Sequence, residues 1–329
     1  MRKKSVNASE VAKRSGVSQS TVSRVFTPGS NVAEKTRQKV LKAAKELNYL
    51  PNALARGLIM NKSSIVGIAM KENQNPFYQD VLTRLTNGLH EKGYQVLFVY
   101  TKNDEIEHED IYKFMEYSVE GVIITDAFLS SEVAMRLSTN HIPFVLLNRY
   151  NINMPCHAVC CDNYKAAEEI AFVLYEKGYR TPAYITGKLN TSTNNDRKLG
   201  FFNAWKSKGI TPLIEEGDYT YEGGFKAARN LLNGPIRPDA VFAANDVLAF
   251  GAMDAMKARG VKIPKDIAVV GFDNIKMASW ISYSLTTWEQ PVEDMVNLTI
   301  QKLLNEINGQ SEERTPVFLP GKLIIRNTI

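Results

Sequence analysis

The sequence predicts an α/β protein in which an all-α N-terminal head precedes a two-lobed core built on doubly wound parallel sheets. The charged residues are unevenly distributed along the chain, which has 40 basic and 35 acidic residues in all. Residues 1–62 contain 13 basic and 3 acidic residues, and residues 63–329 contain 27 basic and 32 acidic residues. The head is therefore basic and the core mildly acidic, which indicates two surfaces with different partners. From residue 63 onward, short apolar runs alternate with amphipathic stretches, as in parallel sheets covered by helices.

Composition excludes several classes of protein. With 44% apolar and 23% charged residues, the chain has the make-up of a globular domain. No apolar run approaches the roughly 18–20 residues of a membrane span, and no signal-peptide stretch follows the basic residues 2–4. We therefore expect a cytoplasmic protein without membrane contact. Cys156, Cys160 and Cys161 flank His157 without zinc-site spacing, so buried thiols are favoured, and no metal or cofactor is expected.

The head contains two short helices joined by a tight turn. Ser9 is expected to cap a helix that ends near Ser15, and Gly16 can supply the positive φ of the turn. Ser18 is expected to cap a second helix over residues 19–26. This arrangement predicts a helix-turn-helix, whose second helix enters the major groove of DNA. A small helical bundle without that role is the alternative.

Side chains of the second helix suit double-stranded DNA. Arg24 can donate two hydrogen bonds to guanine, and Gln19 can pair with adenine. Ser18 and Thr21 can bond to phosphates. Because these groups sit in a cationic head, nucleic acid is the predicted partner.

A third helix is expected over residues 34–47. The residues predicted to face the core of the head are Val40, Leu41, Ala44 and Leu47. The other faces carry Lys35, Arg37, Lys39, Lys42 and Lys45, of which some should reach phosphates and others should be solvated.

The core is predicted to contain two series of alternating strands and helices. In the first lobe, strands are expected at 65–70, 96–100, 122–125 and 144–147, with helices at 77–92, 107–117 and 132–140. In the second lobe, strands are expected at 158–161, 183–186, 240–243 and 268–272, with helices at 164–177, 197–208, 223–232 and 247–259. The tetrapeptide Glu-Lys-Gly-Tyr ends a helix in each series, at 91–94 and 176–179, which fits two similarly built lobes.

Polar residues follow several of the predicted strands, where ligands of doubly wound sheets bind. They are Asn148, Arg149, Asp162, Asn163, Asn245, Asp246, Asp273 and Asn274. Amides and carboxylates beside aromatic rings suit a sugar. Candidate rings are Phe77, Tyr78, Tyr219 and Trp280, and each has a core or surface role as an equal alternative.

Two segments of the head, VNASEVAKRSGVSQSTVSRVF and TRQKVLKAAKELNYLPNALARGL, resemble the lac-repressor/galactose-repressor family of bacterial transcription regulators. The resemblance extends through the core and implies lobes similar to type I periplasmic binding proteins. It also implies base contacts by Gln19, Ser20 and Arg24. Residues 52–58 would form a hinge helix that contacts DNA through Asn52, Ala55, Arg56 and Leu58, with Leu58 wedged into a flexible central step.

The head departs from the family at one position. Ala33 stands where relatives usually have Ser or Thr, which caps the third helix and touches phosphate. Asn31 or Ser30 would replace that cap if the helix began earlier.

The resemblance also assigns effector-binding residues. The segments NPFY, LLNR, NNDRKLGF, AANDVLAFG and VVGFDN imply that Phe77, Tyr78, Asn148, Arg149, Arg197, Asn245 and Asp273 line the cleft, and Tyr219 joins them as an aromatic candidate. Many relatives have Asp at the position of Asn148. With one carboxylate fewer, a neutral or anionic effector is expected, namely a sugar, sugar acid or sugar phosphate. A nucleobase-type effector or a protein corepressor is the alternative.

These observations predict a repressor with three parts: a DNA-binding domain at 1–50, a hinge at 51–62 and an effector-binding and dimerisation core at 63–329. Its first lobe would comprise residues 63–160 and 291–319, and its second lobe 161–290 and 320–329. The closing segment GKLIIRNTI lacks the apolar heptad tail that builds tetramers in some relatives, so a homodimer on a pseudo-palindromic operator is expected, associated with the nucleoid through DNA.

Two other classes of protein, an enzyme and a solute-binding protein, are remote alternatives. No Gly-x-Ser-x-Gly elbow, phosphate loop or dinucleotide fingerprint supports an enzyme. A solute-binding protein would fit the lobes but not the basic head.

Overall fold

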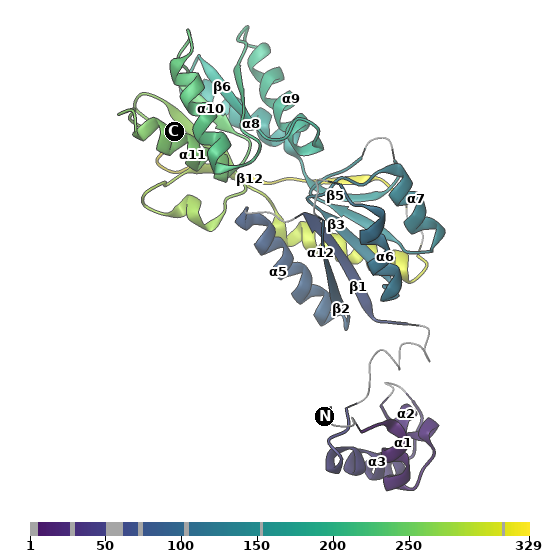
Figure 1. Ribbon diagram of the computed structural model, residues 1–329. Coiled ribbons are helices and arrows are strands. Elements are labelled where there is room, and N and C mark those ends of the chain that lie inside the picture. Colours follow the sequence, from purple (N-terminus) through teal and green to yellow (C-terminus); the bar gives the residue numbers. More distant parts are fainter. Residues whose placement is uncertain are drawn as a thin grey trace. The chain divides into compact units, whose positions relative to one another are not determined.

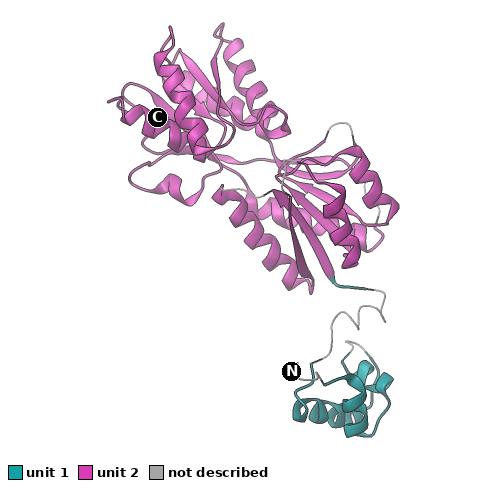
Figure 2. Cartoon of the chain, in the orientation of Figure 1, with its two compact units in different colours: residues 1–64 teal, residues 65–329 magenta. Residues whose placement is uncertain are grey.

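The computed structural model describes residues 6–26, 30–50, 62–71, 75–101, 105–151, 154–310 and 313–329. The chain forms two compact units, residues 1–64 and 65–329 (Figure 2). The four hinge positions predicted to contact DNA, Asn52, Ala55, Arg56 and Leu58, lie outside the described residues. Within those ranges no helix is long and apolar enough to cross a bilayer.

The described part of the head contains helices α1 (Ala8–Ser15), α2 (Gln19–Val25) and α3 (Glu34–Glu46), as predicted. Val11, Val22 and Val40, one from each helix, are fully buried in their common core. Gly16 ends α1 with φ of 69°, in the left-handed region that glycine enters without steric cost. The predicted turn between the first two helices is therefore present.

Three details of the head differ from the predictions. Asn7, not Ser9, caps α1, because its Oδ1 accepts from the amide of Glu10 at 3.0 Å. Leu41 is 39% exposed and Ala43 is buried, since positions 40, 43, 44 and 47 share one helical face and 41 lies beside it. Helix α3 begins at Glu34 with Ala33 as an N-cap that makes no side-chain bond, so no earlier start compensates.

The first lobe is built on a parallel sheet with strand order β11-β5-β4-β3-β1-β2. Its elements are β1 (Ile65–Lys71), α5 (Pro76–Glu91), β2 (Gln95–Thr101), α6 (His108–Glu116), β3 (Gly121–Thr125), α7 (Ser131–Thr139), β4 (Phe144–Leu147), β5 (His157–Cys161), α12 (Val292–Ile307) and β11 (Pro316–Leu319). Helices α5 and α12 pack together (Figure 1). Along β3, Ile123 belongs to their apolar cluster, whereas Val122 and Ile124 pack with residues of α6 and α7.

The second lobe has strand order β12-β10-β9-β8-β6-β7, in which β12 alone is antiparallel to its neighbour. Its elements are α8 (Asn163–Glu176), β6 (Pro182–Thr186), α9 (Ser192–Lys206), β7 (Leu213–Glu216), α10 (Tyr221–Asn233), β8 (Ala240–Ala243), α11 (Asp246–Lys257), β9 (Ala268–Phe272), η1 (Lys276–Ser279), β10 (Thr286–Glu289) and β12 (Lys322–Ile324). Helix α9 begins five residues before the predicted Arg197, because Thr191 caps it by accepting from the amide of Asn194 at 3.3 Å. Helices α8 and α9 form one pair and α10 and α11 another (Figure 1).

The chain passes between the lobes at residue 162, at 290–291 and at 320–321. The first and last of these crossings are joined, since the amide of Asp162 donates to the carbonyl of Leu319 at 2.8 Å. Three short connections of this kind allow the lobes to move relative to each other, because small dihedral changes in each connection alter the angle between two rigid lobes. The fold class is thus the predicted one.

Candidate functional site

The first candidate site is the exposed face of α2 in the head. Gln19, Ser20 and Arg24 are exposed and Thr21 is half-buried, while Val22 and Val25 fix the helix from below. Ser18 caps α2 as predicted, with its Oγ accepting from the amide of Thr21 at 3.2 Å. The five predicted contact residues of this helix therefore share one short stretch of surface.

A network of polar groups holds α2 in place. Ser18 Oγ lies 2.8 Å from Ser20 Oγ and 2.9 Å from Thr21 Oγ1. At the other end, Arg37 of α3 donates to the carbonyl of Val25 at 3.1 Å and to that of Ser30 at 3.2 Å. Arg37 thus satisfies a helix C-terminus instead of extending toward phosphate, which the sequence left open.

The second candidate site lies between the lobes of the core. The eight predicted effector residues line one cavity: Phe77, Tyr78, Asn148, Arg149, Arg197, Tyr219, Asn245 and Asp273. Both lobes contribute to it, because the strands of each parallel sheet end at the edge that borders this cavity. Its volume is about 30 Å³, enough for one water-sized group. A larger ligand must enter with the lobes further apart or extend into neighbouring cavities.

Four cavity residues have backbones in the left-handed region. The φ angles are 53° at Asp126, 67° at Asn148, 62° at Tyr219 and 116° at Asp273. Residues other than glycine adopt such angles at a cost of order 1–3 kcal/mol. Strain of this kind is held by the surrounding structure and is often found at ligand sites, so these angles are consistent with a candidate site at this cavity.

Arg197 and Asp273 form the polar centre of the second lobe. The Arg197 Nε donates to Asn163 Oδ1 at 2.8 Å, and its guanidinium lies 3.5 Å from the Phe272 ring centroid. Burial raises the pKa of Asp273, while Arg197 and hydrogen bonds from Asn75 and Gln290 oppose that shift. The Asn75 bond, 2.9 Å from Nδ2 to Asp273 Oδ2, joins the two lobes directly.

Residues of the first lobe complete the cavity. Asn148 donates through Nδ2 to the Tyr78 hydroxyl at 3.0 Å, and burial raises the pKa of that phenol well above its usual value. The Asn148 Oδ1 is buried without a protein partner among the described residues, which leaves an acceptor for a ligand hydroxyl or N–H. Arg149 is paired with Asp126.

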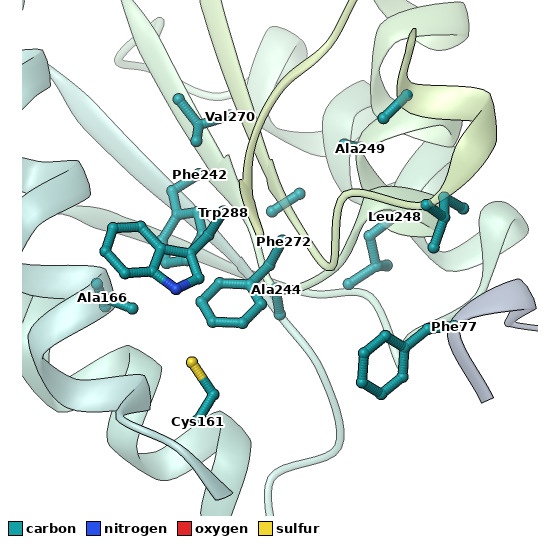
Figure 3. Close-up of a cluster of buried hydrophobic side chains, with 14 of the residues drawn as sticks. Phe77, Cys161, Ala166, Phe242, Ala244, Leu248, Ala249, Val270, Phe272 and Trp288 are labelled. Atoms are coloured by element: carbon teal, nitrogen blue, oxygen red, sulfur yellow. The ribbon is translucent and has the colours of Figure 1, made fainter. Parts of the chain in front are cut away.

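Two of the larger cavities that adjoin the first are lined partly by aromatic side chains. One of about 500 Å³ has an aromatic wall formed by Tyr219, Tyr221, Phe250 and Tyr283. The other, of about 420 Å³, is lined by residues of both lobes that include Arg149, Tyr150 and Asp196. Figure 3 shows Phe77 of the first lobe and Leu248, Phe272 and Trp288 of the second as members of one buried hydrophobic cluster. Space for a metabolite thus lies beside the central cavity.

Sequence reasoning missed three lining residues: Asn75, Asp126 and Thr193. Asp126 directly follows β3, so the strand-end rule could have identified it. Trp280 is 50% exposed and lines none of the cavities described above, which fits the surface role that the sequence left open for it. Asp246 is fully buried, accepting from Thr287 Oγ1 at 2.6 Å and the Ile275 amide at 2.9 Å, and its role is structural.

Cys156, Cys160 and Cys161 are buried free thiols, as favoured from the sequence. Burial raises the pKa of Cys161 to about 11, so its thiol stays protonated near neutral pH. In the described ranges, no group of three or more His, Cys, Asp or Glu side chains is arranged to hold a metal ion.

Comparison with known proteins identifies the families that match the head and the core. Residues 8–52 match the family described as bacterial regulatory proteins, lacI family, and residues 63–327 match the periplasmic binding proteins and sugar binding domain of the LacI family. The chain is 31% identical over 327 residues to the HTH-type transcriptional repressor PurR of Edwardsiella ictaluri, covering 97% of this chain and 96% of that protein. It is 33% identical over 322 residues to the ribose operon repressor of Escherichia coli strain K12, covering 94% and 97%.

Solved structures show the same architecture. The lac repressor dimer bound to operator and an anti-inducer superposes with a TM-score of 0.90 at 28% identity, with 99% of each chain covered. This chain therefore belongs to the LacI family of bacterial regulatory proteins, which are DNA-binding regulators and not enzymes.

Proposed function

We propose that the chain is a homodimeric transcriptional repressor whose heads read a pseudo-palindromic operator and whose core binds a small metabolite. Residues 1–50 would bind DNA, 51–62 would form the hinge, and 63–329 would bind effector and partner subunit. The observation that carries the proposal is the convergence of eight polar and aromatic residues on one interlobe cavity, in a chain with an exposed polar recognition helix. Such a protein would work in the cytoplasm, associated with the nucleoid.

A sugar, sugar acid or sugar phosphate is the proposed effector. Asn148, Asn245 and Asp273 offer amide and carboxylate groups for adjacent hydroxyls. Arg149 and Arg197 supply guanidinium N–H donors for an acid or phosphate group, with Asp126 and Asp273 as counter-charges in the same cavity. The relatives include a ribose operon repressor, which agrees with this class.

A nucleobase-type effector is the second candidate. The aromatic wall of the 500 Å³ cavity, formed by Tyr219, Tyr221, Phe250 and Tyr283, suits a planar ring. Repressors named PurR are among the relatives, and this supports a nucleobase-type effector as the second candidate. No side-chain feature of the described residues argues for a protein corepressor.

Ligand screening of the full chain tests the effector class. A ligand at about 100 times its dissociation constant should stabilise the protein by about 2.7 kcal/mol, a clear rise in melting temperature. The panel should contain sugars, sugar acids, sugar phosphates and nucleobases. Asp273→Asn should abolish the shift, whereas Asp266→Asn should retain it, because Asp266 is exposed and its carboxylate accepts a hydrogen bond from the amide of its near neighbour Lys262, away from the cavity. A hit that survives Asp273→Asn would place binding elsewhere.

Light scattering tests the proposed assembly. Trp280 and Ile281 are 50% and 99% exposed, and such apolar side chains support a subunit contact. The expected mass is twice 36.9 kDa. A monomer or a tetramer at micromolar concentration would contradict the homodimer.

A further inference from the structure

The hydroxyl of Ser9 in helix α1 does not cap its own helix. Asn7 caps α1, so Ser9, the cap expected from sequence, is left with an exposed side chain. Its Oγ instead donates to Oε1 of Gln19 at 3.2 Å, ten residues further along the chain. The bond links the first helix of the motif to the first residue of the second.

Gln19 is the residue for which such a bond matters. Its side chain is exposed at the start of α2, and a free glutamine can turn either its oxygen or its nitrogen toward a base. With Oε1 held by Ser9, the amide nitrogen remains without a partner among the described residues of the head. The bond therefore limits the orientations in which Gln19 can meet DNA, and it reduces the side-chain entropy lost on binding.

The neighbouring readout position has a similar arrangement. Ser20 Oγ lies 2.8 Å from Ser18 Oγ. Ser18 also caps α2, so its removal would disturb the whole helix. The Ser9 hydroxyl makes no hydrogen bond within α1 among the described residues. Its contribution to base readout can therefore be measured separately from the stability of the helix.

We propose that Ser9 is a positioning residue, which fixes the carboxamide of Gln19 and so sharpens the choice of base at one position of each operator half-site. This rests on the proposed reading of an operator by α2. Ser9 need not touch DNA for this effect, because it acts through Gln19. Base recognition in this head thus involves α1 as well as the recognition helix.

Selection from random duplex DNA with the full chain tests the proposal. Ser9→Ala should reduce discrimination about two- to tenfold at one position per half-site, as expected for loss of one hydrogen bond, and leave the other positions unchanged. Ser9→Thr should retain the wild-type profile. Ser15→Ala is the matched control, because that hydroxyl lies on the same helix and bonds to the carbonyl of Val11 at 2.7 Å.

A double-mutant cycle with Gln19→Ala separates positioning of Gln19 by Ser9 from an effect of Ser9 on the structure of the head. In that background Ser9→Ala should cause no further change in base preference. An unchanged profile for Ser9→Ala, or an equal loss of affinity for every sequence, would overturn the positioning role. If the wild-type protein selects no pseudo-palindromic site, the proposed function fails and this inference with it.

Discussion

Tyr150 connects the lobes beside the interlobe cavity, and removing its hydroxyl should lower the stability of the core measurably. Tyr150 follows the first-lobe residues Asn148 and Arg149, and its hydroxyl donates to both carboxylate oxygens of Asp196 in α9, at 3.0 and 3.1 Å. Its amide also donates to Ser192 Oγ at 3.1 Å. The two residues are 46 positions apart in the sequence, and their bond joins the first lobe to the second.

The expected loss of stability depends on the charge of the acceptor, the Asp196 carboxylate. A hydrogen bond to a charged group contributes about 1.5–3 kcal/mol, more than one between neutral groups. In Tyr150→Phe, the half-buried Asp196 carboxylate loses that donor, while the amide bond to Ser192 remains. We therefore expect the free energy of unfolding of the core to fall by about 1.5–3 kcal/mol at pH 7.

The effect should depend on pH. Burial raises the pKa of Asp196, and the Tyr150 bond opposes that shift, so the pKa in Tyr150→Phe should lie higher than in the wild type. The wild-type advantage is therefore complete above the pKa of the variant and declines as the pH falls through it. Below that range the bond joins neutral groups, for which about 0.5–1.5 kcal/mol is expected.

Chemical unfolding at fixed protein concentration, at pH 5 and pH 7.5, measures this difference. Tyr112→Phe is the matched control, because Tyr112 is 52% exposed and its hydroxyl bonds to the surface residue Arg136 at 3.0 Å. Its loss should cost less than about 0.5 kcal/mol. If Tyr150→Phe costs no more than Tyr112→Phe at pH 7.5, the interlobe bond does not stabilise the core.

Three further predictions concern the head, the helix packing and a buried carboxyl. Arg24→Ala should lower operator affinity by about 1–3 kcal/mol and relax base preference in competition binding; unchanged preference would exclude it as a base contact. Gly200→Ala should destabilise the core by about 1–3 kcal/mol in thermal unfolding, since an added Cβ would lie 2.1 Å from the carbonyl oxygen of Tyr164, whereas Gly234→Ala, with contacts no closer than 3.5 Å, should be tolerated. Burial raises the pKa of Asp246 well above its usual value, so its stabilising contribution is complete at low pH and is lost as the pH rises through that value. The melting temperature of the wild type relative to Asp246→Asn should therefore fall as the pH rises above about 4, where the carboxyl ionises in the unfolded chain, and a constant difference would contradict the raised pKa.

Much of the fold was predictable because its determinants are local. The period-3.6 pattern identified all three helices of the head, and buried apolar runs located most strands of both sheets. Helix α12 and strands β7, β10 and β11 were not delimited, since amphipathic or short segments give a weak pattern. The wrong cap at Ser9 arose because Asn7 is an equally good capping residue two positions earlier.

The sequence by itself determined which chemistry the protein carries: a cationic helix-turn-helix, two lobes of parallel sheet, and polar residues at the carboxyl ends of their strands. The tertiary structure decided how those groups are paired. The bond from Asn75 to Asp273 joins residues 198 positions apart, and the bonds from Tyr150 to Asp196 and from Ser9 to Gln19 likewise link separate elements. Sequence periodicity reports which face of an element is buried, whereas these contacts depend on how separate elements pack, which no local pattern encodes.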